Sequence, residues 1–306
     1  MKNLILLLVL LVLAQVTKAE VEFYYFESET FKQELQQEIE GLQDFLKDQI
    51  AFPQDVLITY RPTVGTSYDI KKGVLNIATT ELEAITHEFA HQIFDTNLFK
   101  QSPVWFYYKA RESVRFSDLS DSIRNLKKSI SHLDSARRSF ISQGDHALVP
   151  AIDTRKAQYE KELNFLEEAY QYDRELKDVI EKTNTFRRLV PYQEFFADTL
   201  SIIYYNDWNI MHETVFNVTG NPLVAQSRKY ESSPSVIASY LDPYTHFAKS
   251  RSWLRNHFQS PRDIDVPCLT SAVISAYERD LRSLDYAYSY DEINLNFQEF
   301  YTSCVK

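Results

Sequence analysis

Glycine and positive charge are both scarce in this chain. Only 5 glycines occur among 306 residues, which argues against phosphate-cradling loops and against a glycine-rich all-β fold. The formal net charge is −10. Because phosphate backbones are bound by clustered lysine and arginine, the sequence predicts no nucleic-acid partner. Hydrophobic residues still make up 44% of the chain, which is enough to build a sizeable core.

Long apolar runs are confined to the N-terminus. Residues 4–13 form an unbroken apolar run, Lys2 precedes it, and residues 17–19 offer a small residue at a cleavage point. The run is too short to span a bilayer, so this layout predicts a secretory signal peptide over residues 1–19, with an uncleaved anchor as the alternative. No comparable run follows. We therefore expect a secreted or periplasmic protein with no stable membrane insertion after signal cleavage.

Cysteine is nearly absent, and its two occurrences lie close together near the end of the chain. Cys268 and Cys304 are the only cysteines. An oxidising compartment outside the cytoplasm favours a disulfide between them, whereas free buried thiols are the alternative. Either way, two cysteines at this spacing are too few for a structural zinc site, so we expect a structural role for them.

The stretch THEFAHQIFD, residues 86–95, contains the spacing HExxH. Residues i and i+4 of an α-helix lie on one face about a turn apart, so His87 and His91 can bind one tetrahedral ion from the same side. Glu88 points at the open coordination position, where it can take a proton from a zinc-activated water. Two histidines four apart can also occur on an ordinary helix, and a third ligand decides between these interpretations.

A candidate third ligand lies in LVPYQEFFADTLSIIYYND, residues 189–207. Glu194 and Asp198 are again four apart, on an apolar segment that is expected to be helical after Pro191. A carboxylate from this second helix would complete a His₂Glu site, and the aspartate one turn later could accept a hydrogen bond from a ligand histidine. A solvated acidic edge is the alternative for this pair.

Together the two segments resemble the gluzincin class of zinc metallopeptidases, in which a second helix after the HExxH helix supplies a glutamate ligand. The resemblance implies one Zn²⁺ per chain, bound by His87, His91 and Glu194. It further implies Glu88 as the general base and Asp198 as the carboxylate that orients a ligand histidine. The metzincin class is a poor match, because its glycine and its third histidine are replaced by Phe94 and Asn97.

The periodicity predicts an α+β fold that is predominantly helical. A strand is expected at 21–27, a helix at 30–50, and strands at 55–63 and 72–80 joined by a hairpin-like connection. The motif helix should then run over 81–94, with Thr79 or Thr80 as its N-cap. A small twisted, zincin-like sheet packed on the HExxH helix would result.

The 102 residues between His91 and Glu194 exceed the gap in compact, thermolysin-like gluzincins. Apolar residues at four-three spacing, broken by Arg137 in the first series and Lys156 in the second, predict two long helices joined by a turn. The expected organisation is therefore a signal peptide over 1–19, a sheet and HExxH-helix subdomain over 20–111, an inserted helical hairpin over 112–188, and a C-terminal helical subdomain over 189–306. The hairpin is either scaffold or a lid that limits access to the zinc.

A peptidase also needs a group that stabilises the oxyanion. LDPYTHFAKSRSWLRNH, residues 241–257, follows the second helix. His246 is the candidate, with Tyr244 as the alternative and Arg251 or Arg255 as helpers. The sequence thus predicts an exported zinc metallopeptidase acting on a peptide or protein substrate. The alternatives are a catalytically inactive zinc-binding protein and a helical-hairpin protein-interaction module.

Overall fold

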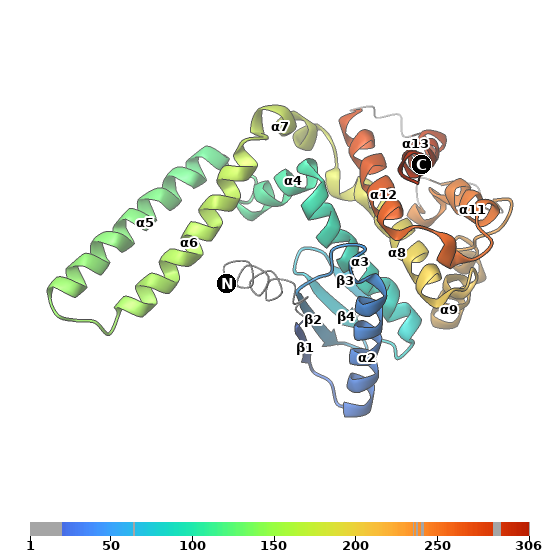
Figure 1. Ribbon diagram of the computed structural model, residues 1–306, viewed down its shortest axis with the longest axis horizontal. Coiled ribbons are helices and arrows are strands. Elements are labelled where there is room, and N and C mark those ends of the chain that lie inside the picture. The colour runs from blue at the N-terminus through green and yellow to red at the C-terminus, as the bar shows by residue number, and fades with distance from the viewer. Residues whose placement is uncertain are drawn as a thin grey trace, which may run out of the picture. The chain divides into compact units, whose positions relative to one another are not determined.

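The computed structural model describes residues 20–63, 65–234, 236, 238–239, 242–283 and 289–305. The described residues form an α+β fold that is mostly helical and contains one small mixed sheet (Figure 1). The predicted signal peptide, residues 1–19, lies outside the described residues. In the described parts of the chain, no helix combines the length and the apolar character that a bilayer crossing requires.

The sheet contains the strands β1 (Glu20–Tyr24), β2 (Asp55–Tyr60), β3 (Ser67–Asp69) and β4 (Val74–Ile77) in the spatial order β1-β2-β4-β3. β1, β2 and β4 run parallel, and β3 pairs antiparallel with β4. The hairpin-like connection expected between 55–63 and 72–80 is therefore wrong. The intervening segment folds into β3 at the sheet edge, which lets β2 and β4 run in the same direction.

Alternate residues of the central strands face the core, as the period of two requires. Ile58 of β2 is paired with Leu75 of β4, and both are fully buried. On the opposite face, Thr59 donates a hydrogen bond to the side-chain oxygen of Asn76 at 2.8 Å. The sheet thus presents one apolar face to the protein interior.

Two helices complete the N-terminal part, α2 (Glu29–Leu46) and α3 (Leu82–Gln101). Ser28 is the N-cap of α2, and its hydroxyl accepts a hydrogen bond from the Phe31 amide in the first turn. α3 is longer than the expected 81–94, and Thr79 accepts a hydrogen bond from the Glu81 amide just before the helix begins. The helices contact each other where Thr86 of α3 donates a hydrogen bond to Glu38 of α2.

Helices and the segments that connect them make up the rest of the described residues. The helices are α4 (Pro103–Ser113), α5 (Leu119–Ser142), α6 (Val149–Tyr170), α7 (Asp173–Lys182), α8 (Thr185–Tyr205), α9 (Ile210–Thr219), α10 (Pro222–Gln226), α11 (Ala248–His257), α12 (Val266–Arg282) and α13 (Tyr290–Cys304), with 3₁₀ turns at Pro243–Thr245 and Pro261–Asp263. α8 begins before Pro191, not after it as expected. Asn184 accepts a hydrogen bond from the Arg187 amide at the start of this helix, so the proline falls inside it.

Aromatic rings fill the core around α8. The Phe195 ring stacks on Phe247 with centroids 4.5 Å apart, and Phe297 of α13 meets Phe195 edge-on at 4.9 Å. All three rings are fully buried. The predicted disulfide is present between Cys268 in the first turn of α12 and Cys304 at the end of α13. This bond ties the last helix to the helix that precedes it.

The described residues fall into two compact units. Unit 1 takes the described parts of 1–97, 189–277 and 288–306, and unit 2 takes those of 98–188 and 278–287. Unit 1 therefore combines the sheet with the C-terminal helices, for which the sequence predicts separate subdomains. Unit 2 holds the predicted hairpin together with α4 and α7.

Within unit 2, α5 and α6 lie side by side as the predicted hairpin (Figure 1). The two residues that interrupt its apolar pattern pair across the seam. Arg137 contacts Asp153 at 2.6 Å, and Lys156 contacts Asp134 at 2.7 Å. The buried residues lie only at the base of the hairpin: Leu119, Ile123, Leu166 and Ala169. Away from the base, no described residue of α5 or α6 is buried.

Candidate metal centre

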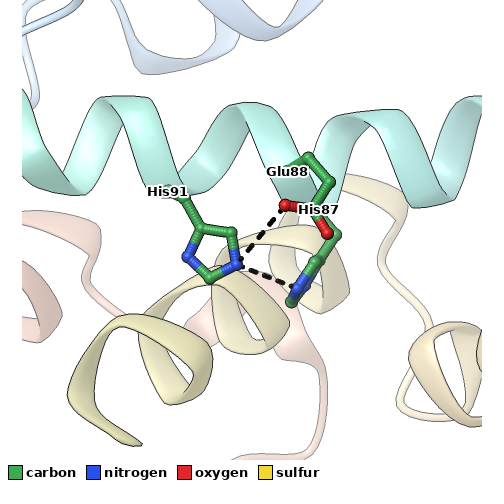
Figure 2. A group of neighbouring side chains, drawn as sticks. All are labelled: His87, Glu88 and His91. Carbon is green, nitrogen blue, oxygen red and sulfur yellow. Dashed lines mark hydrogen bonds and ion pairs between the residues drawn. The ribbon is translucent and has the colours of Figure 1, made fainter. Parts of the chain in front are cut away.

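The three residues of the motif project from one side of α3 (Figure 2). The Nε2 atoms of His87 and His91 lie 3.2 Å apart, and the His91 Nε2 atom is 3.9 Å from Glu88 Oε2. Both histidines are buried, and α3 is packed by apolar neighbours that are also buried: Ile85, Phe89, Ala90, Ile93 and Phe94. The candidate ligand atoms of this His-Glu-His group all lie within 4.8 Å of one another.

α8 brings a second carboxylate to the same point. Glu194 Oε2 lies 3.3 Å from His87 Nε2 and 3.6 Å from His91 Nε2. It is therefore closer to His91 than the Glu88 carboxylate is. The pair of residues four apart on α8 does not form a solvated acidic edge, because Glu194 is largely buried and Asp198 is fully buried.

Asp198 lies behind His87, one turn further along α8. Its Oδ1 atom is 3.2 Å from His87 Nδ1, a short contact whose alignment falls short of a hydrogen bond. The same carboxylate accepts hydrogen bonds from two buried arginines, Arg228 and Arg251, the latter at 2.7 Å. Arg228 also donates to Glu194 Oε2 at 3.2 Å. Two guanidinium groups thus neutralise the two carboxylates of α8.

These charges decide the protonation of the cluster in the metal-free protein. Burial opposes ionisation of Glu194, but His91 and Arg228 outweigh it and lower its pKa to about 2. Burial also opposes protonation of His87, yet its contacts with Asp198 and Glu194 raise its pKa to about 9. For His91, burial outweighs the charge of Glu194 and lowers the pKa to about 3. The second histidine is therefore a neutral imidazole with a free lone pair.

Glu88 forms a hydrogen bond with the edge strand of the sheet. Burial raises its pKa to about 7, and its Oε2 atom accepts a hydrogen bond from the Tyr68 backbone amide of β3 at 2.9 Å. The Tyr68 hydroxyl donates a hydrogen bond to Asp95, further along α3, at 3.2 Å. The sheet edge thereby lies against the motif helix beside the candidate base.

The two candidates for oxyanion stabilisation lie in different surroundings. The His246 ring contacts the Ser239 carbonyl oxygen through Nε2 at 2.9 Å and lies tilted beside the Tyr290 ring. Tyr244 instead covers the Arg228 guanidinium, whose central carbon is 3.6 Å from the ring centroid. Burial and then the charge of Glu194 raise the pKa of Tyr244 to about 12. Tyr244 therefore belongs to the metal-centre surroundings, whereas His246 is engaged by its own loop.

Arg251 and Arg255, the arginines expected to assist in oxyanion stabilisation, also lie in different surroundings. Arg251 donates to the Tyr244 carbonyl oxygen as well as to Asp198, so it links this loop to α8. Arg255 lies over the Trp208 ring, 5.1 Å from its centroid.

Sequence reasoning missed two residues of this site. Arg228 lies in the stretch QSRKY, which matches no motif. The only signal for it in the sequence is that two buried carboxylates need a positively charged partner. The Tyr68 amide is a backbone donor, and its role depends on the unexpected strand β3. No side-chain pattern could have indicated it.

The donor set fits a metal ion. His91 Nδ1 and His87 Nδ1 are both buried without a hydrogen bond to the described residues, while both Nε2 atoms meet the Glu194 carboxylate. Two imidazoles and carboxylates converging in a buried site can hold a divalent cation. Comparison with family models, with characterised proteins and with solved structures finds no match for this chain.

Proposed function

We propose that the chain is a zinc metallopeptidase of gluzincin type that hydrolyses peptide bonds with Glu88 as general base. One observation carries the proposal: the Nε2 atoms of His87 and His91 and the Oε2 atom of Glu194 lie 3.2, 3.3 and 3.6 Å from one another. Tetrahedral bonds of about 2.0–2.2 Å to zinc require ligand atoms about 3.3–3.6 Å apart. The two distances to Glu194 fall in this range, and the distance of 3.2 Å between the two Nε2 atoms is just below it.

The kind of ligand also supports zinc. Magnesium and calcium prefer oxygen ligands, whereas two imidazoles and one carboxylate with an open fourth position are typical of catalytic zinc. When bound, zinc supplies Lewis acidity, which polarises a peptide carbonyl group and makes water a competent nucleophile near neutral pH.

Glu88 is the base in this proposal because it lies beside the three proposed zinc ligands, His87, His91 and Glu194, without being one of them. Its Oε2 atom is 3.9 Å from His91 Nε2, further than Glu194 Oε2. Its side chain is 19% exposed, so a water molecule can reach it. From this position Glu88 takes the proton of the attacking water and later delivers it to the leaving amine.

Tyr244 takes the oxyanion role in place of His246. Among the described residues, its hydroxyl makes no hydrogen bond, while its ring is fixed over Arg228. A fixed phenol with an unused donor is suited to the charge that develops on the carbonyl oxygen.

An extended peptide is the substrate that the surroundings favour. β3 is an edge strand of the sheet, and the amide of its central residue, Tyr68, is directed at Glu88. Extended peptides bind to open sheet edges through main-chain hydrogen bonds. A peptide on β3 would thus run past the general base.

The setting that we propose is outside the cytoplasm. The disulfide between Cys268 and Cys304 supports it, because such bonds persist in oxidising compartments. A protein-interaction module remains the second candidate function, since the outer parts of α5 and α6 have no buried residues. An inactive zinc-binding protein is less favoured because Glu88 is present at the cluster.

Casein cleavage by the purified protein tests the activity. We expect Glu88→Gln to lower the cleavage rate by at least about a hundredfold, because general-base catalysis is worth that much, while zinc content stays the same. Glu81→Gln, an exposed residue just before α3, is the matched control and should cleave as the wild type does. Equal cleavage by Glu88→Gln would remove Glu88 from the mechanism.

A further inference from the structure

Tyr68 forms hydrogen bonds with two residues of α3. Its backbone amide donates to Glu88 Oε2 at 2.9 Å, and its hydroxyl donates to Asp95 at 3.2 Å. Glu88 and Asp95 are seven residues apart, about two turns of α3. The central residue of β3 therefore bridges the stretch of α3 that contains His91 and begins directly after His87.

The Tyr68 amide is not used by the sheet. Among the described strands, β3 pairs with β4 alone, and Tyr68 faces Leu75 in this antiparallel register. Residues opposite each other in such a ladder alternate between those that bond across the pair and those that point outward. Because the Tyr68 amide bonds to Glu88, it belongs to the outward set, on the open edge of the strand.

Two groups therefore compete for this amide. In the free protein, Glu88 accepts its hydrogen bond. A peptide that pairs with the open edge of β3 needs the same outward amide as a donor for one of its carbonyl oxygens. One N–H group cannot serve both acceptors at full strength.

We infer that the Tyr68 amide couples peptide binding to the release of Glu88. In the resting protein the amide occupies one oxygen of the general base. A bound peptide takes the amide over, and Glu88 then becomes free to accept the proton of the attacking water. The inference rests on the proposed peptidase function and makes Tyr68 a positioning residue whose backbone, and not its side chain, is decisive.

A static role is the competing explanation. In that case the amide orients Glu88 throughout the reaction, and loss of the amide can only harm both binding and catalysis. The two explanations differ in what happens when the amide is removed, and proline removes it. An edge strand tolerates proline where the missing N–H points away from the ladder, as it does at Tyr68.

The first experiment compares zinc-loaded Tyr68→Pro with Tyr68→Ala, which lacks the same ring but keeps the amide. Two metal-directed ligands serve as probes: acetohydroxamate, which is too short to lie along β3, and a hydroxamate of a casein peptide that the wild type cleaves. We expect Tyr68→Pro to bind acetohydroxamate about tenfold more tightly, because Glu88 without the amide is free to form one hydrogen bond with this probe. The peptide hydroxamate should bind about tenfold more weakly, because it loses the hydrogen bond that the Tyr68 amide would donate to it. Weaker binding of both probes would overturn the inference.

A second experiment needs no substitution in β3. Hydrogen exchange of the Tyr68 amide is measured by NMR in the wild type and in Glu88→Ala, with and without the casein peptide. We expect exchange at least about tenfold faster in Glu88→Ala, and slow exchange again when the uncleaved peptide is bound. Equal exchange in both proteins would show that Glu88 does not hold the amide.

Failure of this inference is distinguishable from failure of the proposed function. Zinc content and casein cleavage of the wild type are measured on the same preparations. If the wild type binds zinc and cleaves casein but the amide exchanges freely, only the coupling is wrong. If the wild type neither binds zinc nor retains the peptide, the proposed function is wrong and the coupling with it.

Discussion

His87 Nδ1 on α3 lies 3.2 Å from Asp198 Oδ1 on α8. This contact joins the two helices that bear the predicted ligands, and it leaves the Nε2 atom of His87 facing the cluster. Asp198 can be fully buried because Arg228 and Arg251 both donate to its carboxylate. The orientation of one ligand therefore depends on a buried network of charges.

Removal of the Asp198 charge should weaken both the fold and the metal site. Asp198→Asn keeps the shape of the side chain but leaves two buried arginines short of a partner, which costs about 3–5 kcal/mol of unfolding free energy. Loss of the carboxylate behind His87 should lower zinc affinity about 10- to 100-fold. Urea unfolding and competition with a chelator measure the two effects. Glu213→Gln, exposed on α9, is the control, and unchanged zinc affinity in Asp198→Asn would contradict this role.

Arg228 and zinc should partly replace each other as neutralising charges. Arg228→Ala leaves Glu194 without its guanidinium partner, so the metal-free protein should lose about 3–5 kcal/mol of stability. Because zinc neutralises the same carboxylate, the rise in Tm on adding zinc should be larger in this variant than in the wild type. Arg255→Ala, at Trp208, should show the wild-type increment. An equal increment in Arg228→Ala would speak against a shared role.

The disulfide should contribute mainly through the unfolded chain. Cys268 and Cys304 are 36 residues apart, and closing a loop of that length gives about 4 kcal/mol by the chain-entropy relation. We expect the double serine variant to unfold at lower urea concentration while it retains zinc, since neither cysteine borders the cluster. Zinc loss in a variant that is still folded would contradict this separation of roles.

The tip of the α5–α6 hairpin, residues 138–152, should be dispensable for folding. Replacement of residues 138–152 by a short Gly-Ser turn keeps the Arg137–Asp153 pair and removes no buried side chain, so Tm should shift by no more than about 2 °C. Leu166→Ala at the base is the matched contrast and should cost about 2–5 kcal/mol. If this shortened protein is folded and binds zinc but no longer cleaves casein, the hairpin takes part in substrate handling.

The sequence was sufficient for the features that are encoded locally. The long helices follow from apolar spacing, and the contacts of Arg137 and Lys156 show why two charged residues could interrupt that spacing. Glu194 could be selected because a metal site with two histidines on one helix needs a donor from elsewhere. The structure brings its carboxylate to both imidazoles.

Features that depend on long-range pairing could not be predicted in the same way. β3 has only three residues and no strong alternation, so its edge position and the role of Tyr68 follow from the pairing with β4. Arg228 was missed because nothing in its local sequence distinguishes a buried arginine from an exposed one. The predicted start of α8 is wrong because it places Pro191 at the beginning of the helix. The helix begins earlier, where the Asn184 side chain accepts a hydrogen bond from the Arg187 amide.

Zinc content per chain in the wild type and in Glu194→Ala tests the central claim most directly. Both proteins are purified without chelator, loaded with one equivalent of zinc and dialysed, and Glu213→Gln on α9 serves as the control for loss of a carboxylate. The account predicts one zinc per chain in the wild type and the control, and much less than one in folded Glu194→Ala. Full zinc in Glu194→Ala, or none in the wild type, would contradict it.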